Sequence, residues 1–155
     1  MPKLIRDGAI VEDAWREADE DLRTPGPDQI ATLDQWLQLE DKAGSAVQLE
    51  PGQAPTPLVE HLDELALVVV NFPLFTDGRG FSYGRELRER GFQGELRANG
   101  HFITDQMSYL CRCGFNAFRL ADESQLDSAL GSLSDFSEYY QASVDQPLPL
   151  FRRRA

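Results

Sequence analysis

Residues 67–70 read Leu67-Val-Val-Val70, an unbroken apolar run rich in β-branched side chains. Such a run is typical of a strand that is covered on both faces, as in a parallel sheet. After a loop over residues 71–80, the pattern predicts a helix over 82–90 that ends at Gly91. A strand over 96–98 comes next. This stretch therefore predicts one β-α-β unit, which is the building block of α/β proteins.

The same alternation extends in both directions along the chain. Helices are predicted from Asp28 to Lys42, over 58–65, from Thr104 to Gly114, and from Asp122 or Ser124 onward. Strands and helices joined by short links predict a parallel sheet with right-handed crossovers and flanking helices. Four strands are expected, over residues 46–49, 67–70, 96–98 and 117–120. Four are too few for an eight-stranded barrel, so a doubly wound sheet and an open half-barrel both fit the pattern.

The two ends of the chain differ from this core. Asp7-Gly8 lies between two apolar runs and predicts a hairpin, so residues 1–27 are interpreted as an N-terminal β-ribbon followed by an acidic linker. Residues 28–145 form the expected α/β core of a single domain that spans the 155 residues. Residues 146–155 form an apolar and then basic tail. That tail is either a disordered end or a strap that docks on the body or on another subunit, which makes self-association one alternative.

Charge is distributed unevenly along the chain, whose formal net charge is −11. Residues 1–60 hold thirteen acidic and five basic side chains, whereas residues 79–119 hold seven arginines and four acids. A strongly acidic protein lacks the surface that neutralises phosphates, so nucleic acid is excluded as a general partner. The N-terminus lacks the apolar core of a signal peptide, and the longest apolar run is too short to span a bilayer. We therefore expect a cytoplasmic protein that does not enter a membrane.

Polar residues gather in the loops that follow the predicted strands, where ligands bind in open parallel sheets. The sharpest element is Asp77-Gly-Arg-Gly80, in which Gly78 and Gly80 would leave backbone amides free near a helix start for an anion and Arg79 could add a bidentate contact. Alternatively, Asp77 caps the turn and Arg79 pairs with Asp105. Arg97 is either a paired, half-buried arginine or a ligand contact. The candidate binding residues are Asp77, Gly78, Arg79, Gly80, Arg97, Asp105 and Gln106.

Familiar catalytic motifs are missing from the sequence. There is no nucleophile elbow, no phosphate-binding loop with its lysine, and no dinucleotide fingerprint. His61 and His101 are the only histidines, and Cys111 and Cys113 would point in different directions on one helix, so neither a metal site nor a disulfide is expected. No cofactor is predicted. Only Asp77 and Asp105 stand out as candidate acid/base carboxylates.

Several motifs, taken together, resemble those of a bacterial family known as domain of unknown function 934. They are Phe75-Thr-Asp-Gly-Arg-Gly-Phe-Ser82, Gly94-Glu-Leu-Arg-Ala98, Asp105-Gln106 and Arg112-Cys-Gly-Phe-Asn-Ala-Phe118. The resemblance covers about residues 60–145. Members of this family are often encoded beside the assimilatory sulfite or nitrite reductase haemoprotein, and many carry the label "oxidoreductase probably involved in sulfite reduction".

The resemblance implies a setting in sulfur assimilation. We expect an accessory protein of sulfite reduction that binds either the sulfite reductase haemoprotein or a small oxyanion through its Arg/Asp loops. The alternative is a small enzyme of sulfur metabolism that uses Asp77 or Asp105 as acid/base in the same pocket. The sequence does not choose between these two classes.

Overall fold

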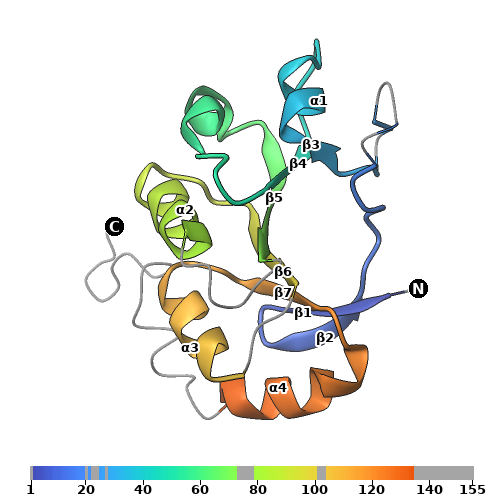
Figure 1. The fold of residues 1–155 in the computed structure, drawn as a ribbon, viewed down its shortest axis with the longest axis vertical. Coiled ribbons are helices and arrows are strands. Elements are labelled where there is room, and N and C mark those ends of the chain that lie inside the picture. The colour runs from blue at the N-terminus through green and yellow to red at the C-terminus, as the bar shows by residue number, and fades with distance from the viewer. Residues whose placement is uncertain are drawn as a thin grey trace.

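The computed structural model of the protein describes residues 2–19, 21, 25–26, 28–72, 79–100 and 104–134. Within them, a seven-stranded sheet has the order β2-β1-β7-β6-β5-β4-β3 (Figure 1). The strands are β1 (Lys3–Arg6), β2 (Ala9–Glu12), β3 (Ala31–Thr32), β4 (Ser45–Leu49), β5 (Leu65–Phe72), β6 (Glu95–Gly100) and β7 (Ala117–Leu120). The helices are α1 (Leu33–Leu37), α2 (Arg79–Glu89), α3 (Thr104–Arg112) and α4 (Leu126–Ser134), with short 3₁₀ helices η1 (Thr56–His61) and η2 (Glu123–Gln125).

All four predicted strands are present, as β4 to β7, and they pair in parallel as expected. The prediction of only about four strands in a parallel sheet is wrong, because the sheet is larger and its orientation is mixed. The ribbon β1–β2 joins it antiparallel to β7, with Ile5 opposite Phe118. Leu4 and Ile5 are fully buried there. A ribbon with one apolar pair on each face gains more burial by pairing with the edge of the sheet than by standing alone.

The predicted hairpin at Asp7-Gly8 is confirmed. Asp7 has φ of 52° and Gly8 has φ of 81°. Two central residues with positive φ define the type I′ turn, whose twist matches that of the strands it joins, and aspartate followed by glycine is a favoured pair in it. This turn sets the β1–β2 register, in which Arg6 lies opposite Ala9.

The predicted helix from Asp28 to Lys42 is wrong in extent. Ala31 and Thr32 instead form β3, which pairs in parallel with Val47 and Gln48 of β4. A helix of only five residues follows. It begins after Thr32, because the Thr32 side chain accepts a hydrogen bond from the Gln35 amide while the Gln35 side chain accepts one from the Thr32 amide. The apolar periodicity that suggested a long helix reflects two short elements, both of which bury side chains in the same core.

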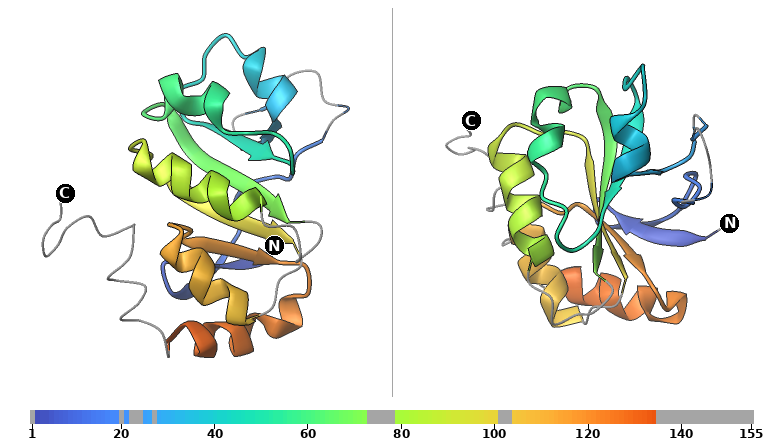
Figure 2. Two further views of the ribbon diagram at one scale, coloured as in Figure 1. Left: turned by 60° about the vertical axis from the view of Figure 1, so that its left-hand side comes forward. Right: turned by 45° about the horizontal axis from the view of Figure 1, so that its top comes forward.

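The helices of the core lie on one face of the sheet, which we call the helix face (Figure 2). Strands β3 to β7 follow one another in sequence order across the sheet, and right-handed crossovers between successive neighbours put every helix on the same side. One cluster holds the buried side chains of this face, including Trp36 of α1, Leu87 of α2, Leu110 of α3 and Ala129 of α4. Strands β3 to β7 are therefore wound in a single direction, whereas a doubly wound sheet reverses its strand order at a central strand.

The opposite side of the sheet, here called the open face, has a thinner cover. Residues 13–18, the N-terminal segment, lie over part of it, where Trp15 and Ala18 pack against a small cluster that includes Leu67 and Val69 of β5. Polar side chains lie on the open face between its strands and this short covering segment, so it is the part of the fold where a site can form.

Among the described residues, no helix is both long and apolar enough to cross a membrane.

Candidate functional site

Most of the loop residues predicted as a site lie at the edge of what the structure describes. Asp77 and Gly78 fall outside the described residues, and so do the side chains of Arg79 and Asp105. Their backbones lie in the first turns of α2 and α3, which begin where β5 and β6 end. The predicted anion loop and the alternative Arg79–Asp105 ion pair both remain predictions.

Gly80 has a role in packing that the sequence analysis did not foresee. A Cβ atom built on Gly80 would lie 2.5 Å from two ring carbons of Phe72, so α2 can approach β5 this closely only because residue 80 has no side chain. Gln106 is half-buried in α3 and has an interaction partner. Gly80 therefore has a packing role between α2 and the sheet, whatever else it contacts.

Arg97 is held in a buried ion-pair network on the open face. The residue is 1% exposed, and its guanidinium donates to Asp13 Oδ2 at 3.1 Å and twice to Glu95 Oε2, at 3.0 and 2.8 Å. Of the two predictions for Arg97, a paired arginine or a ligand contact, the structure therefore shows the paired arginine. A buried guanidinium needs such partners, because desolvation of an unpaired charge is costly.

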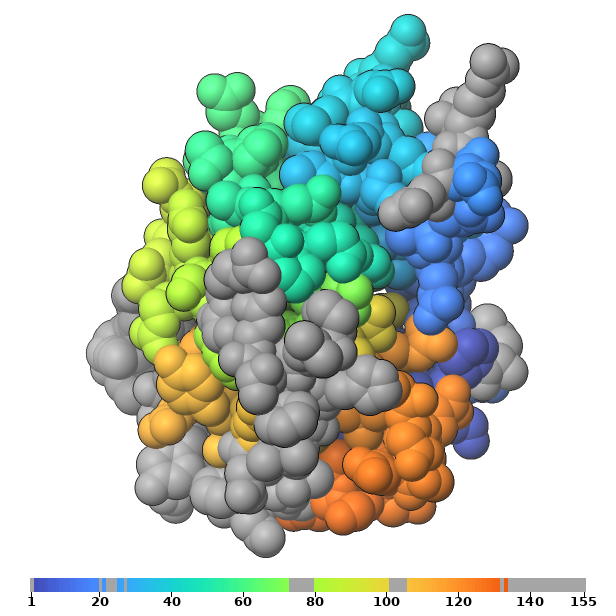
Figure 3. All heavy atoms as spheres, in the orientation of Figure 1, coloured from blue at the N-terminus to red at the C-terminus, as the bar shows by residue number. Residues whose placement is uncertain are grey.

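Asp13 extends this network to the next strand. It also accepts a hydrogen bond from Arg119 at 3.1 Å, and Arg119 lies 3.2 Å from Glu17, whose side chain is 67% exposed. In the space-filling view, blue atoms of the N-terminal part lie against orange atoms from much later in the chain (Figure 3). The network thus fastens the N-terminal segment across β6 and β7. Its carboxylates also neutralise the charges of Arg97 and Arg119.

A row of polar residues crosses the carboxyl ends of four neighbouring strands on the open face. Asn71 of β5 lies opposite Asn99 of β6, and Asn99 lies opposite Arg119 of β7. On the other side, Glu50 follows β4 directly and accepts a hydrogen bond from Asn71 Nδ2 at 2.8 Å. We call Glu50, Asn71, Asn99 and Arg119 the carboxyl-edge row. It occupies the edge at which open parallel sheets bind their ligands.

A hollow of about 650 Å³ opens beside the Glu50 end of this row. Both carboxylate oxygens of Glu50 accept hydrogen bonds from carboxamides, at 2.6 Å from Gln48 Nε2 and at 2.8 Å from Asn71 Nδ2. The Glu50 amide in turn donates to Gln53 Oε1 at 2.8 Å. The described residues around the hollow include two carboxylates and no lysine or arginine: Ala18, Thr32, Asp34, Gln35, Gln38, Gln48, Glu50 and Gln53.

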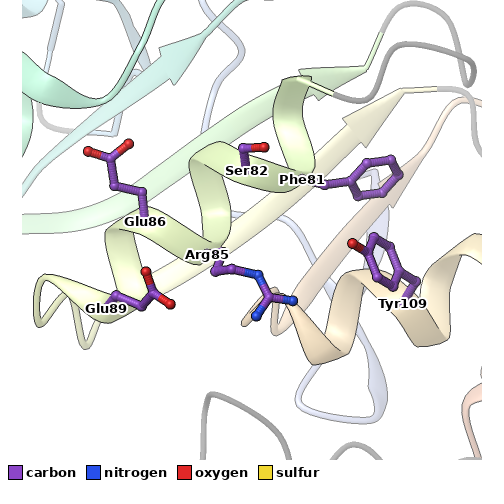
Figure 4. Close-up of a pocket in the computed structure, with 6 residues that line it drawn as sticks. All are labelled: Phe81, Ser82, Arg85, Glu86, Glu89 and Tyr109. Atoms are coloured by element: carbon purple, nitrogen blue, oxygen red, sulfur yellow. The ribbon is translucent and has the colours of Figure 1, made fainter.

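A second hollow, of about 440 Å³, lies between α2 and α3 on the outside of the helix layer (Figure 4). Its rings are Phe81 and Tyr109, whose centroids are 5.1 Å apart in an edge-to-face arrangement. Arg85 Nη2 donates a hydrogen bond to Cys113 Sγ at 3.8 Å, and this hydrogen bond raises the pKa of Arg85. This hollow lies on the helix side of the sheet, away from the carboxyl-edge row on the open face.

The cysteines and His61, which could in principle take part in catalysis or metal binding, make contacts that stabilise the fold. Cys111 and Cys113 are both buried, and no disulfide bond joins them. His61 pairs with Glu64 at 2.7 Å and packs edge-on against Trp36. No group of three or more potential metal ligands occurs in the part of the chain that the structure describes.

Arg88 is not a surface residue of its helix. It is half-buried, and its guanidinium donates to the carbonyl oxygens of Gly114, Phe92 and Gly94 at 2.8 to 2.9 Å. These carbonyls belong to the turns that precede β6 and β7, so Arg88 fixes the amino edge of the sheet. Glu86, on the same helix, pairs with Arg90 at 3.1 Å.

Sequence reasoning missed Glu50, Arg119 and Asp13. Glu50 directly follows a predicted strand, so the rule that placed the other candidates at carboxyl ends could have found it. Arg119 lies inside a predicted strand and had the same signal as Arg97. Asp13 carries no local signal, because its partner Arg97 is 84 positions away.

One family model matches the chain, over residues 46–151, and its description is "Bacterial protein of unknown function (DUF934)". No curated protein and no solved structure matches. The matched region includes all of β4 except Ser45, together with β5 to β7, α2 to α4 and every residue of the carboxyl-edge row.

Proposed function

Since the chain belongs to the bacterial family DUF934, we propose that it is an accessory protein of assimilatory sulfite reduction, which acts by binding the reductase haemoprotein at the carboxyl edge of its sheet. The setting in sulfite reduction comes from the resemblance of its motifs to those of proteins encoded beside the reductase. The choice of protein binding over oxyanion binding comes from the ion pairs of the open face.

The pairing of Arg97 and Arg119 is the observation that supports this choice. An oxyanion needs guanidinium groups that can turn toward it, but each of these arginines already contacts two carboxylates. Their side chains are 2% and 16% exposed. Freeing Arg97 would leave Asp13 buried with a diminished set of partners, which is costly. The described arginines of the open face therefore stabilise the sheet, and a broad surface is a better binding element than a pocket built around them.

The net charge of the protein indicates what kind of surface its partner should present. The net charge of −11 repels small anions over the Debye length, about 8 Å at physiological ionic strength. The same field attracts a basic surface and raises the rate at which the two proteins meet. The expected partner surface on the reductase is therefore basic overall, with a carboxylate that pairs with Arg79, and its binding should weaken as salt is added.

The test is a pull-down of the reductase haemoprotein by the purified protein, with calorimetric titration of the reductase, sulfite and sulfate. Arg79→Ala changes the first residue of α2, at the carboxyl edge of the sheet. Arg90→Ala is the matched control, because Arg90 follows the last residue of the same helix, at the opposite edge. Circular dichroism and thermal unfolding check that both variants fold.

Reductase binding that Arg79→Ala weakens and Arg90→Ala preserves supports the proposal. Equal effects of the two variants would place the binding surface elsewhere. Sulfite or sulfate binding without reductase binding would contradict the proposal and favour the enzyme alternative, in which Asp77 or Asp105 is the acid/base carboxylate.

A further inference from the structure

Glu50 is a carboxylate whose charge is not balanced by any described basic side chain around it. Its hydrogen-bond donors, Gln48 and Asn71, are both neutral carboxamides. They fix the direction of the carboxylate and satisfy one site on each oxygen, but they leave its negative charge in place. The residue is half-buried, so water screens that charge less than it would on an open surface.

This arrangement contrasts with the neighbouring acidic residues of the same face. Asp13 and Glu95 each contact at least one arginine in the ion-pair network around Arg97. A carboxylate that only stabilised the sheet would be expected to share in that network. Glu50 instead lies at the margin of a hollow of about 650 Å³ that has room for a small molecule.

We propose that this hollow binds an organic cation that carries several N–H donors, namely a guanidinium or a primary ammonium group. The Glu50 carboxylate supplies the charge, and each oxygen has a further acceptor site beyond the one that a carboxamide occupies. A planar guanidinium matches the paired oxygens of a carboxylate, which strengthens the contact. Asp34, exposed on α1 at the rim of the same hollow, provides a second negative charge for the approach of the ligand.

The carboxamides of the lining add hydrogen-bonding capacity without opposing charge. Gln48 donates through Nε2 to Glu50, so its Oε1 remains an acceptor for an N–H group of the ligand. Gln53 is held by the Glu50 amide, which positions the loop after β4. This loop is also tied to α2, because the Gly52 amide donates to the Tyr83 hydroxyl at 3.0 Å. The acceptors are therefore held in place before a ligand arrives, which lowers the entropic cost of binding.

The experiment is a titration of the ¹⁵N-labelled full-length protein, followed by NMR, at low salt. Agmatine is the probe, since it carries both a guanidinium and an ammonium group, while glycerol and sulfite are the neutral and anionic comparisons. We expect agmatine to shift the signals of the Gln48 and Gln53 side-chain amides and of the Glu50 backbone, with a Kd on the order of 1 mM. Added salt should weaken the binding.

Glu50→Gln removes the charge and keeps the shape, and it should weaken agmatine binding by at least about tenfold, or ~1.4 kcal/mol. Glu89→Gln, on α2 beside the second hollow, is the matched control and should leave the Kd unchanged. Asp34→Asn is the second variant, for which a smaller loss is expected because the residue is exposed. Thermal unfolding checks the fold of each variant.

Failure of agmatine to shift these signals would overturn the proposal, and so would an equal Kd in Glu50→Gln and the wild type, or equal binding of glycerol. Truncation after Gln146 separates two sources of the cation. Tighter agmatine binding by the truncated protein would support the site and identify the arginines of the protein's own tail as competing ligands, whereas an unchanged Kd would support a free small molecule. None of these measurements uses the reductase, so their outcome is separate from that of the proposed function.

Discussion

Replacing Asp13 by asparagine is expected to lower the free energy of unfolding by about 3 kcal/mol. Asp13 Oδ2 accepts hydrogen bonds from Arg97 and Arg119, both at 3.1 Å, and the Asp13 side chain is 1% exposed. The substitution keeps the shape of the side chain but removes the charge from both contacts. The carboxylate oxygen Oδ1, which accepts from the Trp15 amide at 3.0 Å, can be replaced by the carboxamide oxygen.

The magnitude follows from what Arg97 retains. Removing one partner of a buried ion pair costs about 3 to 5 kcal/mol, since the remaining charge is left without compensation. Arg97 still contacts Glu95 through two nitrogens, at 3.0 and 2.8 Å, so the lower end of that range applies. For a protein of this size, 3 kcal/mol corresponds to a decrease in Tm of roughly 6 to 12 °C.

Urea unfolding at neutral pH measures the change, with Glu17→Gln as the matched control. Glu17 contacts the same Arg119 at 3.2 Å, but its side chain is 67% exposed, so the control should cost no more than about 1 kcal/mol. Hydrogen exchange adds a local readout, because the Arg16 amide donates to Asp28 O at 2.7 Å and should exchange faster once the N-terminal segment is loosened.

A double-mutant cycle tests the assignment to this ion pair. Arg97→Met should cost less in the Asp13→Asn background than in the wild type, with a coupling energy of about 1 to 3 kcal/mol. The reasoning is refuted if Asp13→Asn and Glu17→Gln destabilise equally, or if the coupling energy is zero within error. Either result would mean that Asp13 does not hold the N-terminal segment on the sheet.

Further predictions concern packing, pH and assembly. Gly84→Ala should lower the free energy of unfolding in urea by about 1 to 3 kcal/mol, because its Cβ would lie 2.3 Å from a Phe115 ring carbon. Gly131→Ala should raise it by about 0.5 to 1 kcal/mol, because no atom lies within 4 Å of the added Cβ. The opposite order would contradict the packing of α2. Ser124 lowers the pKa of Asp122 below 3.8 through its hydroxyl and its amide, so the carboxylate stabilises the fold above its unfolded pKa and loses that effect as pH falls through the lower folded value. The Tm of Asp122→Ala should therefore lie below that of the wild type at pH 7 and converge with it in acid, and a constant gap would exclude this origin. If the C-terminal tail mediates self-association, truncation after Gln146 should reduce the mass measured by light scattering, and an unchanged mass would exclude that role.

Local signals made most of the sheet predictable from the sequence. The apolar runs of β4 to β7 are strands in any context that covers them, and Gly91 and Gly114, each with φ of 105°, end their helices where the sequence places them. The Asp7-Gly8 turn is encoded in two residues. The helix over 28–42 failed because the periodicity of apolar residues does not report where a chain changes from strand to helix, and here Thr32 makes that change with its capping interactions.

The candidate site was only partly accessible to the same reasoning. The rule that ligands lie at the carboxyl ends of strands applies to Asn71 and Asn99, which directly follow predicted strands, and the structure brings them opposite each other. It could not indicate that Glu50 would be held by Asn71 or that Arg97 would be buried against Asp13. Those contacts depend on strand register and on the path of the N-terminal segment.

The sequence by itself therefore determined the elements whose cause lies within a few residues: the apolar strands, the glycine helix ends and the hairpin turn. Tertiary structure alone decided that the hairpin extends the sheet beside β7, that every helix of the core lies on one face, and that Glu50, Asn71, Asn99 and Arg119 form a row. The physical reason is the range of the interactions. Turns and caps are satisfied by neighbours along the chain, whereas burial, strand register and the pairing of buried charges are satisfied by residues that only folding brings together.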